Sequence, residues 1–173
     1  MVCCVIGGGL SAMPRQWVGA ILAGRAGGHG PADVGQAVAV LRHQVPLLIV
    51  STDGDPAPLN NCGVPVVAGG WTGSAGMLLA AFEWTAKNAW ETPWVATVPA
   101  GGAPIPPDLV ARLAVAVSGC AAEAACVTKG GRLVLELGLW PVRLQGDLRR
   151  VLTGGGEKSL DDWARGLSIA VVS

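Results

Sequence analysis

PWVATVPAGGAPIPPDLVARL (Pro93–Leu113) is the stretch that decides the fold of this chain. The run Trp94–Val98 is apolar and contains β-branched residues, as a buried strand does, and glycines and prolines follow it directly. Pro107 suits the first turn of a helix, and the carboxylate of Asp108 is stabilised at the positive end of a helix dipole. Leu109–Val117 is therefore expected to be helical. A buried strand that leads into a helix is the repeating unit of a parallel sheet.

The same alternation of short β-rich runs and helical patterns extends over the whole chain, which indicates a mostly parallel sheet with crossover helices. The expected strands are Val2–Ile6, Leu47–Ser51, Val64–Val67, Trp94–Val98, Leu133–Leu137 and Leu167–Val172. The expected helices are Gln36–His43, Ala75–Trp90, Leu109–Val117 and a short one that begins with a Ser159–Asp162 capping box and ends at Gly166. Glu83 and Lys87 are expected to pair on the exposed face of the long helix.

Composition places the chain in the α/β class. Its 173 residues predict a single domain, residues 1–173, and only 14% of them are charged while 51% are hydrophobic, so both faces of the sheet are expected to be covered by helices. Twelve basic and twelve acidic residues cancel. This balance argues against a nucleic acid or an anionic membrane surface as a partner.

Cysteine usage and hydropathy predict a cytoplasmic protein. The five cysteines have neither a C-x-x-C pair nor histidines at zinc spacing, so we expect buried thiols in a reducing compartment. No apolar stretch reaches the roughly 18 residues of a membrane span, and the first residues lack the basic lead of a signal peptide.

The opening segment VCCVIGGGLSAMP (Val2–Pro14) is typical of a strand that runs into a phosphate-binding glycine loop. Gly7, Gly9 and Ala12 satisfy G-x-G-x-x-A, so a dinucleotide-dependent oxidoreductase is one alternative. Pro14 argues against it because a proline there would break the first turns of the helix that this motif requires.

Seven spaced segments together resemble a known family. They are GGGLSAM (7–13), LAGR (22–25), DGDPAPL (53–59), GVPVVAGGWTGSAGMLLAAFEW (63–84), PWVATVPAGGAPIPPDLVARL (93–113), GLWPVRLQGDLRRVL (138–152) and LDDWARGLSIAVV (160–172). Their order and spacing resemble the molybdenum cofactor guanylyltransferase family of the MobA type.

The resemblance implies a three-layer, Rossmann-like fold of the nucleotide-diphospho-sugar transferase type. It also implies an activity, the transfer of GMP from GTP to the terminal phosphate of molybdopterin, with Mg²⁺ as cofactor and release of pyrophosphate. A molybdoenzyme or its maturation factor is a further partner that the resemblance suggests.

Family members carry a phosphate loop of the form L-A-G-G-x-S-x-R-M-G-G-x-D-K. By resemblance, the nucleotide-binding residues are Gly7, Gly8, Gly9, Leu10, Ser11 and, further along the chain, Asp53. Trp17 then stands at the position of the loop lysine, and Arg15 is the nearby cation that could contact a phosphate as the catalytic residue. An alternative placement puts the loop at Ala20–Gly30. It is disfavoured because the distance from there to the end of the next helix, near Gln44, is short for the family.

The metal site departs from the family pattern. Relatives end the fourth strand in P-x-D-T-P, and this chain has Gly101 at the position of the magnesium-binding aspartate, two residues after Pro99. A glycine offers no side-chain oxygen to Mg²⁺, so no metal ligand is predicted. The sequence therefore predicts a weakened or inactive guanylyltransferase, and the alternative is a non-catalytic module that binds a nucleotide, molybdopterin or a molybdoenzyme.

Overall fold

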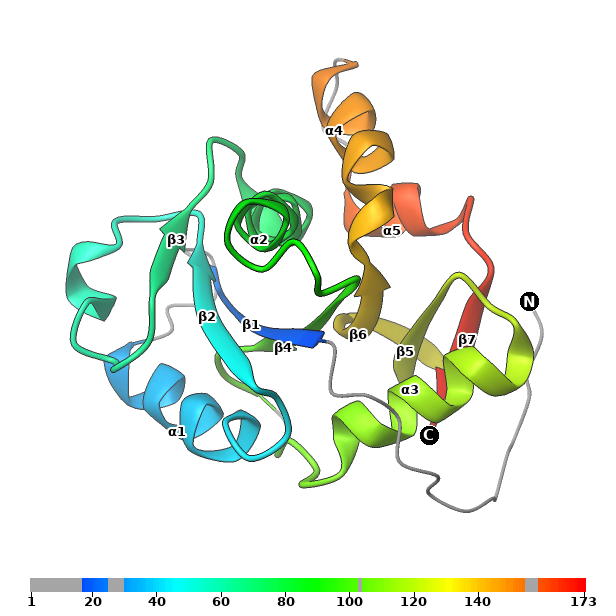
Figure 1. Cartoon of the computed structure of the whole chain (residues 1–173), viewed down its shortest axis with the longest axis horizontal. Coiled ribbons are helices and arrows are strands. Elements are labelled where there is room, and N and C mark those ends of the chain that lie inside the picture. The colour runs from blue at the N-terminus through cyan, green and yellow to red at the C-terminus, as the bar shows by residue number, and fades with distance from the viewer. Residues whose placement is uncertain (1–16, 25–29, 103, 155–158) are drawn as a thin grey trace.

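The computed structural model describes residues 17–24, 30–102, 104–154 and 159–173. They form one seven-stranded sheet with the strand order β3-β2-β1-β4-β6-β5-β7 (Figure 1). The strands are β1 (Trp17–Ala23), β2 (Leu47–Thr52), β3 (Val66–Ala68), β4 (Trp94–Pro99), β5 (Ala124–Lys129), β6 (Arg132–Pro141) and β7 (Ile169–Val172).

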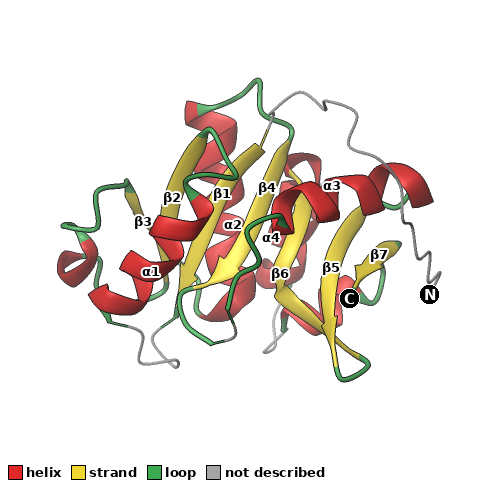
Figure 2. Cartoon of the chain, turned by 90° about the horizontal axis from the view of Figure 1, so that it is seen from below, coloured by secondary structure: helices red, strands yellow, loops and turns green. Residues whose placement is uncertain are grey.

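The sheet is mostly parallel, as the sequence predicts. The strand β1 pairs in parallel with both β2 and β4, and β3 and β7 are parallel to their neighbours β2 and β5. Only β6 runs against its neighbours, β4 and β5. Figure 2 shows β1 and β4 side by side in the middle of the sheet.

Helices cover both faces of the sheet, which completes the expected three layers (Figure 1). They are α1 (Pro31–Leu41), α2 (Gly73–Asn88), α3 (Leu109–Cys120), α4 (Gln145–Thr153) and α5 (Leu160–Ala164), with short 3₁₀ turns η2 (Ala57–Leu59) and η3 (Val142–Leu144). One core lies between the sheet and α1 and α3, and a second lies between the sheet and α2, α4 and α5. No helix in the described part of the chain has the length and apolar character needed to span a bilayer.

The structure corrects the predicted list of elements at several places. The strands β1 and β5 and the helix α4 are not among the predicted elements, and β3 lies slightly later than the predicted run Val64–Val67. The predicted strand Val2–Ile6 lies outside the described residues. In β1, Gly19 masks the strand pattern, but the glycine is there for packing: a Cβ at this position would lie 2.8 Å from Val45 Cγ2 and 2.9 Å from Leu41 Cδ2.

The exposed face of α2 also differs from expectation. Glu83 Oε1 lies 2.7 Å from Arg149 Nη2 of α4, so Glu83 pairs across to the neighbouring helix and not along its own helix with Lys87. An exposed pair of this kind adds little to stability. Its effect is to link the outer surfaces of the two helices.

A buried indole fixes β6 against β4. Trp140 is fully buried, its Nε1 donates a hydrogen bond to Thr97 Oγ1 at 3.0 Å, and its ring centroid lies 5.5 Å from that of Trp163 in α5. A Cβ at Gly138 would lie 2.7 Å from the same indole nitrogen. The order Gly-x-Trp in this segment therefore follows from packing, because only glycine leaves room for the ring.

We expect Thr97→Val to lower the free energy of unfolding by about 1–3 kcal/mol, because the buried indole N–H of Trp140 loses its acceptor. Thr97→Ser keeps the acceptor and serves as the matched control. Urea unfolding of both variants measures the difference. Equal stabilities of the valine and serine variants would contradict this assignment.

Gly76, near the start of α2, makes a second close contact. A Cβ there would lie 2.4 Å from the backbone oxygen of Trp71, so we expect Gly76→Ala to destabilise the protein by about 1–3 kcal/mol as the segment before α2 is displaced. Gly35→Ala in α1 is the control, since nothing lies within 4 Å of a Cβ at that position and alanine favours a helix. Chemical unfolding should separate the two variants, and a neutral Gly76→Ala would show that the contact is not needed.

Candidate functional site

The candidate site lies at the carboxyl edge of the sheet, which we define as the edge where β1, β2, β3 and β4 end. The crossover from β1 passes through α1 on one face, and the crossover into β4 passes through α2 on the other. The strand order thus reverses between β1 and β4. Ligands of open α/β sheets bind at such a switch point, beyond the carboxyl ends of the strands.

Hydrogen bonds hold the ends of β1 and β2 together at this edge. The Thr52 hydroxyl donates to the Ala23 carbonyl at 2.9 Å and accepts from the Gly54 N–H at 3.1 Å. On the other side of β1, the Ala100 N–H donates to the Leu22 carbonyl at 2.9 Å. The three strand ends that border the switch point are therefore fixed relative to one another.

Two carboxylates hold the N-terminus of α2. Asp53, just after β2, accepts a hydrogen bond from the Gly73 N–H at 2.8 Å through Oδ2. Glu136 accepts one from the Ser74 hydroxyl at 2.9 Å through Oε1. Carboxylates are favoured near the positive end of a helix dipole, so both contacts stabilise this helix start.

Glu136 reaches the site through the register of β6. The pairing of β6 with β4 ends at Thr97 and Gly138, so Glu136 lies beyond the last pair, where β6 passes the end of β4. Sequence reasoning did not single out this residue. The only signal was a charged residue inside an otherwise apolar strand, and the strand register is needed to place it at this edge.

Among the described residues, Glu136 influences the pKa of one neighbouring group, the thiol of Cys126. Burial, and then the negative charge of Glu136, raise the pKa of the Cys126 thiol well above its usual range. A thiol in this state stays protonated at neutral pH. Cys126 is fully buried and packs in the second core as part of β5.

The predicted site residues have different outcomes. Asp53 lies at the carboxyl edge, as described above. The others lie outside the described residues: Gly7, Gly8, Gly9, Leu10, Ser11 and Arg15. Their assignment stays a prediction.

The structure corrects the expectation for Trp17. It is the first residue of β1, it pairs with Trp94, and its indole N–H donates to the Gln44 carbonyl at 3.2 Å. Trp17 is thus a strand residue and not a substitute for the loop lysine. The strand that leads into α1 is β1, which supports the alternative placement of the phosphate loop at Ala20–Gly30.

This placement makes the connection between β1 and α1 short. Residues 25–30 alone separate Leu22-Ala23-Gly24 from Pro31, the first residue of α1. The family pattern places more positions than this after its own L-A-G. The span between β1 and α1 is short whichever placement of the phosphate loop is correct, so the choice between the two placements stays a prediction.

The described end of β4 lacks the side-chain ligand that the family resemblance implies for magnesium. The strand β4 ends at Pro99, and Gly101 follows without a side-chain oxygen. Within the described ranges, no three His, Cys, Asp or Glu side chains come together as metal ligands. Asp53 and Glu136, the carboxylates of this edge, are both engaged by the start of α2.

The described segments that border the site also contain no lysine or arginine. These segments are residue 24, residues 52–54, residues 69–74 and residues 99–102. Arg25 follows Gly24 in the sequence but lies outside the described residues. The charge supplied by the described segments is therefore negative.

Comparisons with known proteins agree with this architecture. A molybdenum cofactor guanylyltransferase from Rhodopseudomonas palustris (strain BisB5) is 33% identical over 135 residues, which are 76% of this chain and 64% of that protein. One from Nitrobacter hamburgensis is 32% identical over 141 residues, 80% of this chain and 68% of that protein. This chain thus spans less than two thirds of the length of the Rhodopseudomonas relative.

A solved structure shares the fold. Molybdopterin-guanine dinucleotide biosynthesis protein A from Archaeoglobus fulgidus superimposes with a TM-score of 0.66 at 11% identity, over 90% of this chain and 82% of that one. The family described as the MobA-like NTP transferase domain matches residues 29–167. This chain therefore belongs to the MobA-like NTP transferase domain family.

Proposed function

We propose that this chain acts in molybdenum cofactor biosynthesis as a guanylyltransferase-like protein in which transfer of GMP from GTP to molybdopterin is weakened or lost. The relatives named as molybdenum cofactor guanylyltransferases support the pathway. The proposed loss of activity rests on one observation: Gly101, which follows the end of β4, has no side chain that could bind a metal ion.

The chemistry explains why this position matters. Transfer of GMP requires in-line attack of a phosphate oxygen on the α-phosphorus of GTP, so catalysis consists of positioning and of neutralising negative charge. Mg²⁺ in such sites is held by one or two carboxylates together with the substrate phosphates. At this edge, the described carboxylates of Asp53 and Glu136 bond to the start of α2, and the described segments add no cation.

The scaffold still supports binding. The carboxyl ends of β1, β2 and β4 remain fixed around the switch point, and glycines such as Gly70 and Gly101 border it without side chains. A guanine nucleotide, molybdopterin or a molybdoenzyme could therefore be bound without efficient transfer. This is the non-catalytic module that the sequence offered as an alternative.

The dinucleotide-dependent oxidoreductase has less support. Its motif, Gly7 to Ala12, lies outside the described residues, and the family match supports a nucleotidyltransferase fold. NADH binding in the absence of guanine nucleotide binding would favour it.

A transfer assay tests the proposal directly. With GTP, Mg²⁺ and molybdopterin, we expect this chain to form the guanine dinucleotide at roughly one hundredth or less of the rate of the Rhodopseudomonas palustris relative, because an electrostatic group aimed at the reacting phosphate contributes roughly 10²–10³ in rate. The relative, assayed in parallel, is the positive control. Comparable rates for the two proteins would overturn the proposal.

A carboxylate introduced at position 101 tests whether the missing metal ligand is the cause of the proposed loss of GMP transfer. We expect Gly101→Asp to strengthen Mg²⁺-dependent binding of GTP by about tenfold or more, measured by isothermal titration with and without the metal. Gly101→Asn has nearly the same shape without the charge and is the matched control. If the unmodified chain already binds GTP in a strongly Mg²⁺-dependent way, another group supplies the ligand and the assignment fails.

A further inference from the structure

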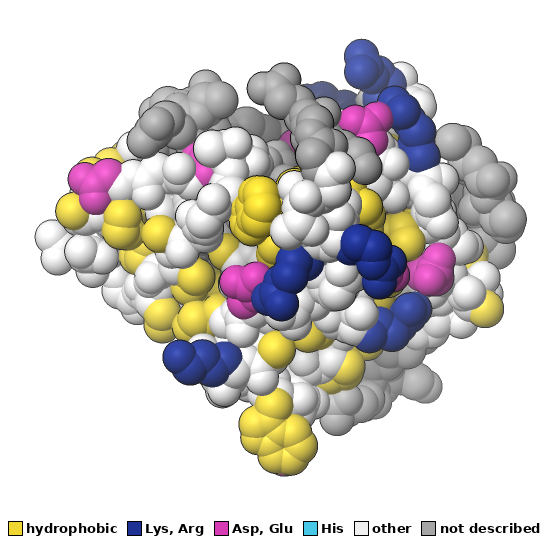
Figure 3. All heavy atoms as spheres, turned by 90° about the horizontal axis from the view of Figure 1, so that it is seen from above, with side chains coloured by type: hydrophobic (Ala, Val, Ile, Leu, Met, Phe, Trp, Pro, Cys, Tyr) yellow, Lys and Arg dark blue, Asp and Glu magenta, His cyan; other side chains and the backbone are white. Residues whose placement is uncertain are grey.

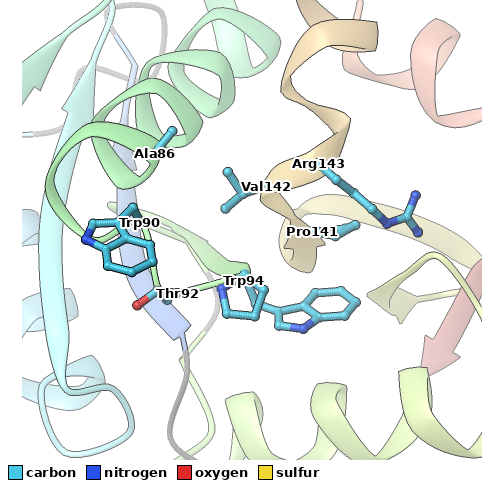
Figure 4. Close-up of a pocket in the computed structure, with 8 residues that line it drawn as sticks. Ala86, Trp90, Thr92, Trp94, Pro141, Val142 and Arg143 are labelled. Carbon is cyan, nitrogen blue, oxygen red and sulfur yellow. The ribbon is translucent and has the colours of Figure 1, made fainter.

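A pocket lies at the opposite edge of the sheet, where β4 begins and β6 ends. Its volume is about 290 Å³, and Trp94 of β4 pairs there with Pro141 of β6. The lining includes Trp90, Pro93, Trp94, Pro141, Val142 and Arg143. Figure 4 shows Trp90 and Arg143 on opposite sides of this pocket, with Val142 between them. The pocket is thus far from the candidate site in the fold, at the other end of the same strands.

Trp90 projects beside the pocket. It is 77% exposed, whereas the other exposed large apolar side chains among the described residues, Leu47 and Trp71, are 44% and 38% exposed. Figure 3 shows apolar atoms that project beyond the outline of the molecule at one rim of the face covered by α2 and α4. An indole left in water forgoes the burial of a large apolar area. Here the indole also borders a pocket lined by further apolar side chains, and this combination indicates a partner surface.

The apolar surface continues along this edge. Leu47 is the first residue of β2, and the register places it beside Val18 of β1, while Trp17 lies beside Trp94. Leu47 and Trp90 therefore lie where the parallel strands begin, at the edge opposite the carboxyl edge. They are two of the three exposed large apolar side chains of the described residues.

Two residues of opposite charge, Glu91 and Arg143, lie beside the pocket. Glu91 follows Trp90 directly and is exposed. Arg143 lies on the far rim, its side chain is 61% exposed, and its 3.6 Å contact with Glu123 is a weak surface pair. The acidic Glu91 thus lies next to Trp90 on one side of the pocket, and the basic Arg143 lies on the other side.

We propose that the occupant of this pocket is a second copy of the chain. In a two-fold dimer, Trp90 of each copy enters the pocket of the other, and Glu91 of each copy meets Arg143 of the other. A two-fold interface uses the same patch on both subunits, which requires the projection and the pocket to be neighbours, as they are here. The formal net charge of zero removes long-range repulsion between copies. This inference does not depend on the proposed function.

The surface area that the proposed dimer buries determines the expected affinity between the two copies. Two inserted indoles bury roughly 300–500 Å² together, a fraction of the roughly 1,600 Å² of a standard interface, so the flanking apolar edge must contribute as well. We expect association in the micromolar range. Sedimentation velocity and light scattering of the full chain, from about 1 to about 100 µM, should show a concentration-dependent shift from monomer to dimer.

Trp90→Ala is expected to weaken dimerisation by roughly 30-fold or more, because a central tryptophan is a typical interface hot spot. The exposure of Trp90 means that its removal should leave the thermal unfolding curve unchanged. Trp71→Ala is the control, since it removes an exposed indole from the other edge of the sheet. A protein that is monomeric at all concentrations, or a Trp90→Ala variant that dimerises as before, would overturn the proposal.

Charge reversal tests the arrangement within the dimer. Glu91→Arg and Arg143→Glu should each weaken dimerisation, because each places like charges opposite one another, and the double variant should restore it. Arg150→Glu, an exposed reversal on α4, is the control and should have no effect. Failure of the double variant to recover would exclude the pairing of Glu91 with Arg143 across the two-fold axis.

Discussion

The parallel pairing of β1 with β4 is the constraint on which the rest of the molecule depends. Because both strands run in the same direction, their carboxyl ends lie at one edge of the sheet. The chain leaves β1 for α1 on one face of the sheet and enters β4 from α2 on the other face. The candidate site is the consequence of this geometry and not of any single side chain. The same pairing brings Trp17 and Trp94 together at the other edge, where the apolar surface around Trp90 begins.

The start of α2 shows how this chain uses the charge at its carboxyl edge. In a nucleotidyltransferase the carboxylates near the reacting phosphates act on a metal ion. Here, one oxygen each of Asp53 and Glu136 accepts a hydrogen bond from Gly73 and Ser74, so both carboxylates contribute to the stability of a helix end. A phosphate that approached this helix start would meet two negative groups. Among the described segments of this edge, the side-chain charge is therefore negative.

Local signals in the sequence predicted the structure well. The Ser159–Asp162 capping box is present, with the Asp162 N–H donating to Ser159 Oγ at 3.2 Å, because both partners lie within one helical turn. The strand predicted at Trp94–Val98 is found at Trp94–Pro99 because a short run rich in apolar and β-branched residues is typical of a strand in a sheet covered on both faces.

Features set by distant contacts could not be predicted in this way. The strand β1 was missed because the need for Gly19 arises from Leu41 and Val45, which lie on a later helix and the turn after it. The role of Glu136 depends on the register between β4 and β6 and on a hydroxyl at the start of α2. Neither is encoded in the residues next to it. The family resemblance placed the phosphate loop at Gly7–Ser11 in preference to Ala20–Gly30, and the first of these segments lies outside the described residues.

The two hydrophobic cores draw mostly on residues inside strands and helices. Val45 and Ala100 of the first core lie in loops, and neither core includes Gly101 or Asp53. Gly101 itself contributes no side chain to either core, so the proposed loss of a metal ligand at this position would leave the packing of both cores intact. The sheet positions the site through the ends of its strands, while the two cores hold the strands together. The residues that border the site and the residues that fill the cores are therefore largely different sets.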